Sequence, residues 1–156
     1  MIEIKNIEKS FDGTKILKGV SAVFEAGKTN LIIGQSGSGK TVMLKSLLGI
    51  HTPETGTISF DGRIYSDLSS EEKRELRTEI GMLFQGSALF DSMTVAENVA
   101  FPLKMFTHDD KDKIQDRVDF VLKRVALVDA HHKLPSEISG GMQKRVAIAR
   151  AIVNNP

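Results

Sequence analysis

The chain has 156 residues, of which 21 are basic and 20 acidic, for a net charge of +1, and 40% are hydrophobic. This is the balance of one ordinary globular domain, and it predicts neither a nucleic-acid surface nor a strongly acidic partner. The absence of cysteine excludes disulfides, thiolate metal sites and cysteine nucleophiles, and no stretch approaches the ~20 apolar residues of a membrane-spanning helix.

β-Strands are predicted over most of the first 33 residues. Isoleucines alternate with polar residues in 2–7, and Asp12-Gly13 is a tight-turn dipeptide before the next apolar stretch. A second turn at 25–28 precedes Leu31-Ile32-Ile33, a continuous run typical of a strand buried on both faces. Three further elements are predicted before residue 85: a helix at 40–48, a strand at 57–60 and a buried strand at 80–84.

From about residue 94 onward the apolar spacing becomes helical. Ser69 with Glu72 is a possible capping box for an earlier, short charged helix, and Thr107 or Asp110 could cap a longer one. One apolar face of that longer helix is predicted to be core: Ile114, Val118, Val121, Leu122 and Val125. After Pro135, Ser139 opens a last helix with its own apolar side: Met142, Val146, Ala149 and Val153.

Residues 34–41, Gly-Gln-Ser-Gly-Ser-Gly-Lys-Thr, fit the pattern G-x-x-x-x-G-K-[ST] in full. Glycines let successive backbone N–H groups point toward phosphate oxygens, and the N-terminus of the following helix adds partial positive charge. Lys40 would add a full charge at the β- and γ-phosphates, and the Thr41 hydroxyl would bind Mg²⁺. The pattern predicts a nucleoside-triphosphate site. The alternative is a chance glycine-rich turn, and the dinucleotide pattern G-x-G-x-x-G does not fit.

A second glycine-rich segment, Ser139-Gly140-Gly141, opens the last predicted helix. A helix N-terminus with free N–H groups and a hydroxyl can bind an anion. On these residues alone, an ordinary serine-capped helix start is equally plausible.

In their order and spacing, these motifs resemble those of ABC transporter ATPases over essentially all of the chain. The family signature Leu-Ser-Gly-Gly-Gln reads Ile138-Ser139-Gly140-Gly141-Met142 here, and residues 145–151 match the helix after it. Phe11 matches the aromatic residue that stacks on adenine, although it could be a core aromatic. Gln85 matches the Q-loop glutamine, although it could satisfy local backbone. Met142 could also be the first core contact of its helix.

The resemblance implies an α/β P-loop NTPase fold with a RecA-like core, an N-terminal antiparallel β subdomain and a helical signature subdomain at about 88–140. ATP and Mg²⁺ are the implied cofactors, with Lys40 and Gln85 catalytic and with Thr41 and Gln85 at the metal. The implied nucleotide contacts are Phe11, Gly34, Gln35, Ser36, Gly37, Ser38, Gly39, Lys40, Thr41 and Val42, with Ser139, Gly140, Gly141 and Met142 acting from a second subunit.

The resemblance also implies partners. These are a second cassette in a head-to-tail homodimer and a membrane permease that contacts the region from Gln85 to Met93, which would hold the protein on the inner, cytoplasmic face of the cell membrane. The segment from Met82 to Leu103 is similar to Mla/Mce-type ATPases, which serve trafficking of phospholipids or hydrophobic solutes. Amino-acid importers, non-transport cassettes of DNA repair or translation, and regulatory or scaffolding cassettes are the alternatives.

Family members continue past the signature helix with a Walker B Asp-Glu pair, a D-loop and a switch histidine, and none of these lies before Pro156. The resemblance therefore implies a partial nucleotide-binding domain, C-terminally truncated, with an incomplete sheet between the predicted strands at 30–33 and 80–84. Without the general-base glutamate, we expect weak nucleotide binding and negligible hydrolysis from this segment, which could also fail to fold alone.

Overall fold

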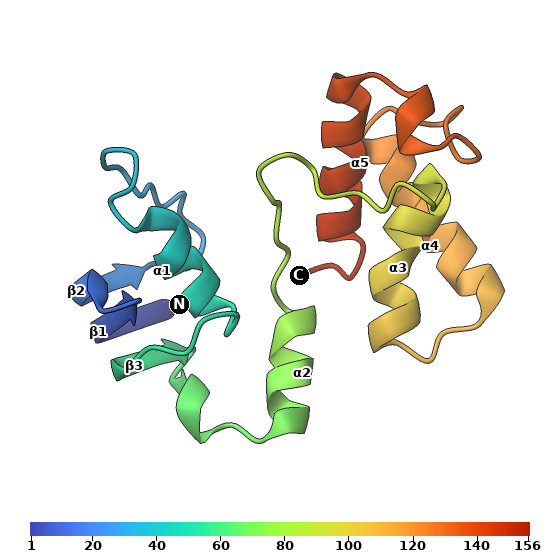
Figure 1. The fold of residues 1–156 in the computed structure, drawn as a ribbon. Coiled ribbons are helices and arrows are strands. Elements are labelled where there is room, and N and C mark those ends of the chain that lie inside the picture. Colours follow the sequence, from blue (N-terminus) through green and yellow to red (C-terminus); the bar gives the residue numbers. More distant parts are fainter. The chain divides into compact units, whose positions relative to one another are not determined.

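The computed structural model describes residues 1–156, which form two compact units, Met1–Lys73 and Arg74–Pro156. Figure 1 labels the α-helices and the strands β1, β2 and β3. None of the five α-helices combines the length and the apolar character that a bilayer-spanning helix needs.

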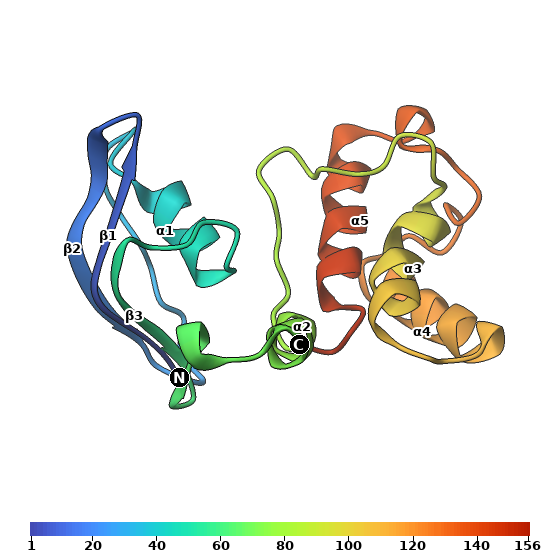
Figure 2. The ribbon, with the colours of Figure 1, turned by 60° about the horizontal axis from the view of Figure 1, so that its bottom comes forward.

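The first unit is built on a four-stranded antiparallel sheet in the order β2-β1-β3-β4. One helix, α1, packs against this sheet (Figure 2). Their shared core comprises Ile4, Ile7, Leu17, Ile58 and Phe60 of the strands with Met43 and Leu47 of the helix. The element bounds are β1 Ile2–Phe11, β2 Thr14–Phe24, α1 Lys40–Leu47, β3 Thr55–Phe60 and β4 Arg63–Ile64, followed by a 3₁₀ turn, η1, at Tyr65–Asp67.

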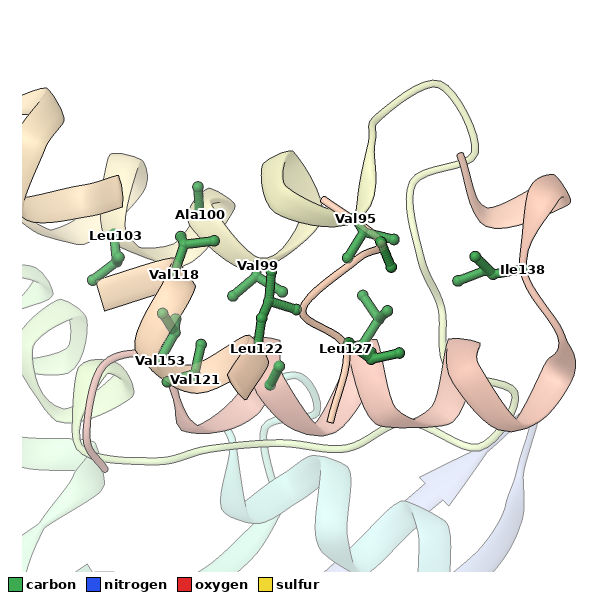
Figure 3. Packing of buried hydrophobic residues seen from close by; sticks show 13 residues of the cluster. Val95, Val99, Ala100, Leu103, Val118, Val121, Leu122, Leu127, Ile138 and Val153 are labelled. Carbon is green, nitrogen blue, oxygen red and sulfur yellow. The ribbon is translucent and has the colours of Figure 1, made fainter. Parts of the chain in front are cut away.

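The second unit is helical. Helix α2 (Ser70–Thr78) spans the boundary between the units, and α3, α4 and α5 enclose a single apolar cluster (Figure 3). The bounds of these helices are Val95–Phe106 for α3, Lys111–Arg124 for α4 and Gly140–Ile152 for α5, with a 3₁₀ turn, η2, at Pro135–Glu137. The cluster contains the predicted core residues Val118, Val121, Leu122, Val146, Ala149 and Val153, and Ile114, Val125 and Met142 pack against it.

Side-chain caps fix where these helices begin. The predicted pair Ser69 and Glu72 forms reciprocal bonds at the start of α2, of 2.7 Å from Ser69 N to Glu72 Oε2 and 3.2 Å from Glu72 N to Ser69 Oγ. Of the two candidate caps for α4, Asp110 is the one used, because its carboxylate accepts from Lys113 N at 2.9 Å. Thr107 instead closes the end of α3.

Two predicted strands do not form. Residues 31–33 and 80–84 form no regular secondary structure and pair with no strand, and Leu31 and Ile33 are 82% and 81% exposed. A strand needs a hydrogen-bonded neighbour, and no strand of the sheet pairs with either segment. The sheet that was expected to include these two runs is therefore incomplete, as expected. The prediction of strands from apolar content was wrong for both runs.

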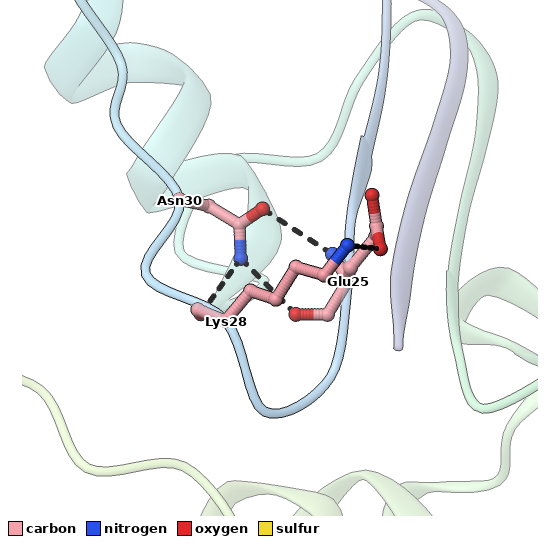
Figure 4. A network of polar contacts seen from close by, with 3 residues as sticks. All are labelled: Glu25, Lys28 and Asn30. Carbon is pink, nitrogen blue, oxygen red and sulfur yellow. Dashed lines mark hydrogen bonds and ion pairs between the residues drawn. The ribbon is translucent and has the colours of Figure 1, made fainter.

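The turn before residues 31–33 does form as predicted. The Asn30 amide closes it, since its Oδ1 accepts from Glu25 N at 3.3 Å and its Nδ2 donates to Glu25 O and Lys28 O, both at 3.1 Å (Figure 4). The Lys28 ammonium also pairs with the Glu25 carboxylate. The end of β2 is thus fixed locally, and the unpaired run begins just beyond it.

Asn98, on α3, is the polar centre of the second unit and has no exposed surface. Its Oδ1 accepts from Phe90 N at 2.8 Å, and its Nδ2 donates to Phe90 O, Met93 O and Thr94 O at 3.1, 3.0 and 3.0 Å. One side chain thereby satisfies the backbone of the loop that leads into α3.

We predict that Asn98→Ala lowers the free energy of unfolding by about 2–4 kcal/mol, because several buried backbone groups lose their partner at once. Urea unfolding of the variant measures this. Ser92→Ala, an exposed change in the same loop, should stay within about 0.5 kcal/mol of the parent. A loss for Asn98→Ala no larger than for Ser92→Ala would show that Asn98 does not hold the loop.

Candidate functional site

The loop 34–41 bends sharply into α1, and the bend depends on Gly39. Gly39 has φ +94°, and a Cβ there would lie 3.1 Å from Leu17 Cδ2 and 3.2 Å from Ile16 Cγ2 on β2. A side chain is therefore disfavoured by backbone strain and by the closeness of the strand. The bend brings the start of α1 against β2 and leaves the N-terminus of the helix facing the loop.

The first turn of α1 is suited to an anion. No side chain caps it, and it contains no acidic residue. The first backbone N–H groups of a helix have no partner within the helix, so they are available to a ligand, and the helix dipole adds partial positive charge. Thr41, whose hydroxyl is the predicted metal contact, lies exposed in this turn.

The Lys40 side chain folds back over the loop. Its Nζ donates to Gly34 O and Gln35 O, both at 2.7 Å. Gly34 is confined too, since a Cβ there would lie 2.7 Å from Ser38 Oγ. The loop, the ammonium group and the start of α1 thus form one positively charged turn, in which Lys40 could exchange the two carbonyls for oxygens of a phosphate chain.

Phe11 lies at the end of β1 and is 38% exposed, so it is not part of the sheet core. It pairs with Thr14 across the β1–β2 hairpin, and the same strand, β2, contacts Gly39 through Ile16 and Leu17. In Figure 2 the hairpin end and the start of α1 lie at the same end of the unit. The hairpin end, where Phe11 lies with its ring accessible, and the start of α1 are therefore at the same end of the unit.

Gln85 lies in the second unit, exposed in a turn after the unpaired run 80–84. After Gly86, Ser87 and Ala88 have positive φ values of 67° and 47°. Arg150 of α5 holds this strained loop, since its Nη2 donates to Ser87 O at 2.7 Å and its Nη1 to Ala88 O at 2.8 Å. Burial of the guanidinium lowers the pKa of Arg150 below its ordinary range. Sequence reasoning matched Arg150 to the family helix and missed this role.

Ser139 caps α5, with its Oγ accepting from Met142 N at 3.3 Å. The hydroxyl hydrogen remains able to donate to a ligand. Gly140 and Gly141 are exposed, and a Cβ would meet nothing within 4 Å at Gly140 and only Ser139 Oγ, at 3.9 Å, at Gly141. The packing of this chain thus gives no reason for glycine at either position. Met142 packs against the apolar cluster, as its alternative interpretation predicted.

The predicted contacts fall into two groups. The first unit holds Phe11 and residues 34–42, with Val42 in the first turn of α1. The second unit holds Gln85 and the signature segment 138–142, and Arg150 ties the Gln85 loop to the helix that this segment opens.

Comparison with known proteins places the chain in a family. The family model described as ABC transporter matches residues 17–156. The probable ribonucleotide transport ATP-binding protein mkl of Mycobacterium leprae (strain TN) is 44% identical over 155 residues, which are 99% of this chain and 45% of that protein. The methionine import ATP-binding protein MetN of Clostridium acetobutylicum is 39% identical over 156 residues, all of this chain and 48% of that protein.

A solved structure supports the same family assignment. The dimeric, post-hydrolysis ATP-binding cassette MJ0796 bound to ADP and Pi matches with a TM-score of 0.88 and 34% identity, over 100% of this chain and 71% of that chain. The chain spans about half the length of the two curated relatives described above. Its fold is that of the P-loop cassettes, with a small antiparallel sheet that is not closed. The chain therefore belongs to the ABC transporter family, as a sequence of its ATP-binding domain.

Proposed function

We propose that the loop 34–41 binds the triphosphate of ATP with Mg²⁺, in an ATPase subunit that powers a transporter. The observation that carries this is the uncapped start of α1 with the Lys40 ammonium folded over the same turn. Backbone N–H groups and Lys40 would hold the β- and γ-phosphates, and Thr41 would bind the metal. Phe11 would stack on the base, since its ring is accessible at the hairpin end of the same unit.

The signature segment would act on a second copy of the chain. Gly140 and Gly141 lie exposed with no packing contact that excludes a side chain, so a close-approaching partner explains them better than the fold of their own unit does. Ser139 would donate its free hydroxyl hydrogen to a γ-phosphate bound at Lys40 of the other subunit. In such a head-to-tail pair, nucleotide joins two chains, so binding favours closure and hydrolysis releases it.

Hydrolysis needs groups beyond the loop. Gln85 would contact the metal and the attacking water, and Arg150 would keep its loop in place. Hydrolysis would also need a general base that takes a proton from the attacking water.

The proposed cargo and permease of the transporter are argued from sequence similarity. The similarity of the segment 82–103 to Mla/Mce-type ATPases favours a phospholipid or hydrophobic solute. The mkl relative is named for ribonucleotide transport and the MetN relative for methionine import, which are the competing cargo classes. The permease would contact the region from Gln85 to Met93. Phe84, just before this region, and Phe90, within it, are each 39% exposed.

The binding prediction concerns Lys40. We expect Lys40→Ala to weaken binding of MgATP to the full-length protein by about 10- to 100-fold, because a charged hydrogen-bonding group at the phosphates is worth about 1.5–3 kcal/mol. Titration calorimetry measures it. Lys45→Ala, which removes an ammonium at the other end of α1, is the matched control and should bind MgATP as the parent does. Equal affinity of Lys40→Ala and the parent would contradict the proposed site.

The proposed transport function predicts an integral-membrane partner. The full-length protein, purified from membranes by an affinity tag, should bring an integral-membrane permease with it, and phospholipid vesicles should stimulate the ATPase activity of that complex several-fold. The Lys40→Ala complex gives the background rate. Recovery without any permease would favour a non-transport cassette, and stimulation by methionine or ribonucleotides in place of phospholipid would overturn the proposed cargo.

A further inference from the structure

The segment His51–Glu54, which links α1 to β3, bonds to the end of β1 where Phe11 lies. The Glu54 carboxylate accepts from Ser10 N at 2.8 Å through Oε1 and from Ser10 Oγ at 3.1 Å through Oε2. Glu54 N in turn donates to Glu8 O at 2.8 Å. Glu54 therefore holds Ser10, the residue immediately before Phe11, through both its backbone N–H and its hydroxyl group.

The Phe11 ring itself touches the same segment. The rings of Phe11 and His51 meet edge-to-face, with centroids 5.1 Å apart and an interplanar angle of 74°. The Lys9 ammonium lies over the Phe11 ring at 5.4 Å and 3.9 Å from Glu54 Oε1. Edge-to-face packing of this kind fixes ring orientation as well as contributing contact energy.

His51 is in turn tied to α1. His51 N donates to Lys45 O at 3.3 Å, next to the bond of 2.9 Å from Ile50 N to the same carbonyl. The start of α1 contacts β2 through Gly39. The start of α1, which carries the proposed phosphate-binding turn, thus lies against β2. Beyond its other end, residues 51–54 contact the end of β1, where Phe11 lies.

We propose that His51 and Glu54 are positioning residues, which hold the Phe11 ring at the place and angle where it stacks on the base of the nucleotide bound at Lys40. This inference rests on the proposed function and adds to it the residues that set the base platform. A ring ordered before binding does not lose rotational freedom on binding, so the stacking contact yields more affinity. The hydrogen bond from Ser10 N–H also lowers the pKa of Glu54, because it stabilises the ionised carboxylate.

A purely structural role is the competing explanation, and the ligand distinguishes the two. Inorganic tripolyphosphate carries the phosphate chain of ATP without a base. A positioning role for Phe11 changes affinity for ATP alone, whereas a general loosening of the unit would weaken both ligands together.

The test measures binding of MgATP and of magnesium tripolyphosphate to the full-length protein. We expect His51→Ala and Glu54→Ala each to weaken ATP binding by about three- to tenfold, a fraction of the stacking contribution of one base. Binding of tripolyphosphate should stay within about twofold of the parent. His51→Phe, which retains an aromatic ring, should restore most of the ATP affinity, and Glu71→Ala is the matched control for loss of an exposed glutamate.

Unchanged ATP affinity in both variants, or an equal loss for ATP and tripolyphosphate, would overturn the positioning role. The proposed function fails differently. If the parent binds neither ligand, or if Lys40→Ala binds both as the parent does, the phosphate site itself is refuted, whatever the His51 and Glu54 variants show.

Discussion

The left-handed bend at Gly39 is the constraint on which the rest of the candidate site depends. It turns the chain from an exposed loop into α1 within a single residue, at a point where β2 leaves little room for a Cβ. Because of that bend, the start of the helix faces back over the loop, and the next residue, Lys40, can reach the carbonyls of Gly34 and Gln35. Free N–H groups, a helix dipole and an ammonium group then converge in one turn that contains no acidic residue.

In the second unit, polar side chains bond to the backbone of loops within the same unit. Asn98 satisfies the loop before α3, and Arg150 satisfies the carbonyls of Ser87 and Ala88, so a buried amide and a half-buried guanidinium stabilise irregular backbone that apolar packing alone could not. The glycines after Ser139 have no such role. The same unit therefore combines a loop beside Gln85 that Arg150 holds with a helix start at which Gly140 and Gly141 are exposed. In the proposed head-to-tail pair, this exposed helix start would face the nucleotide bound to the second chain.

Elements with their own partners inside the chain were predictable from sequence. The Asp12-Gly13 hairpin, the capping box of Ser69 and Glu72, and the core face of α4 depend on residues that lie close together in the chain. The runs 31–33 and 80–84 were not predictable in the same way, because apolar content indicates a buried strand only where a neighbouring strand exists. The loop 34–41 was identifiable because its pattern encodes backbone geometry. The contacts of His51, Glu54 and Arg150 were not identifiable from the sequence, because they join residues tens of positions apart and no spacing pattern predicts them.

The phosphate site can be tested by a structure of the full-length protein with Mg²⁺ and a non-hydrolysable ATP analogue. We expect the phosphates to lie in the turn formed by residues 34–41, with Lys40 Nζ moved from the carbonyls of Gly34 and Gln35 to phosphate oxygens. We expect the base to lie against the Phe11 ring. Phosphates bound elsewhere, with Lys40 still on those two carbonyls, would contradict the proposed phosphate site.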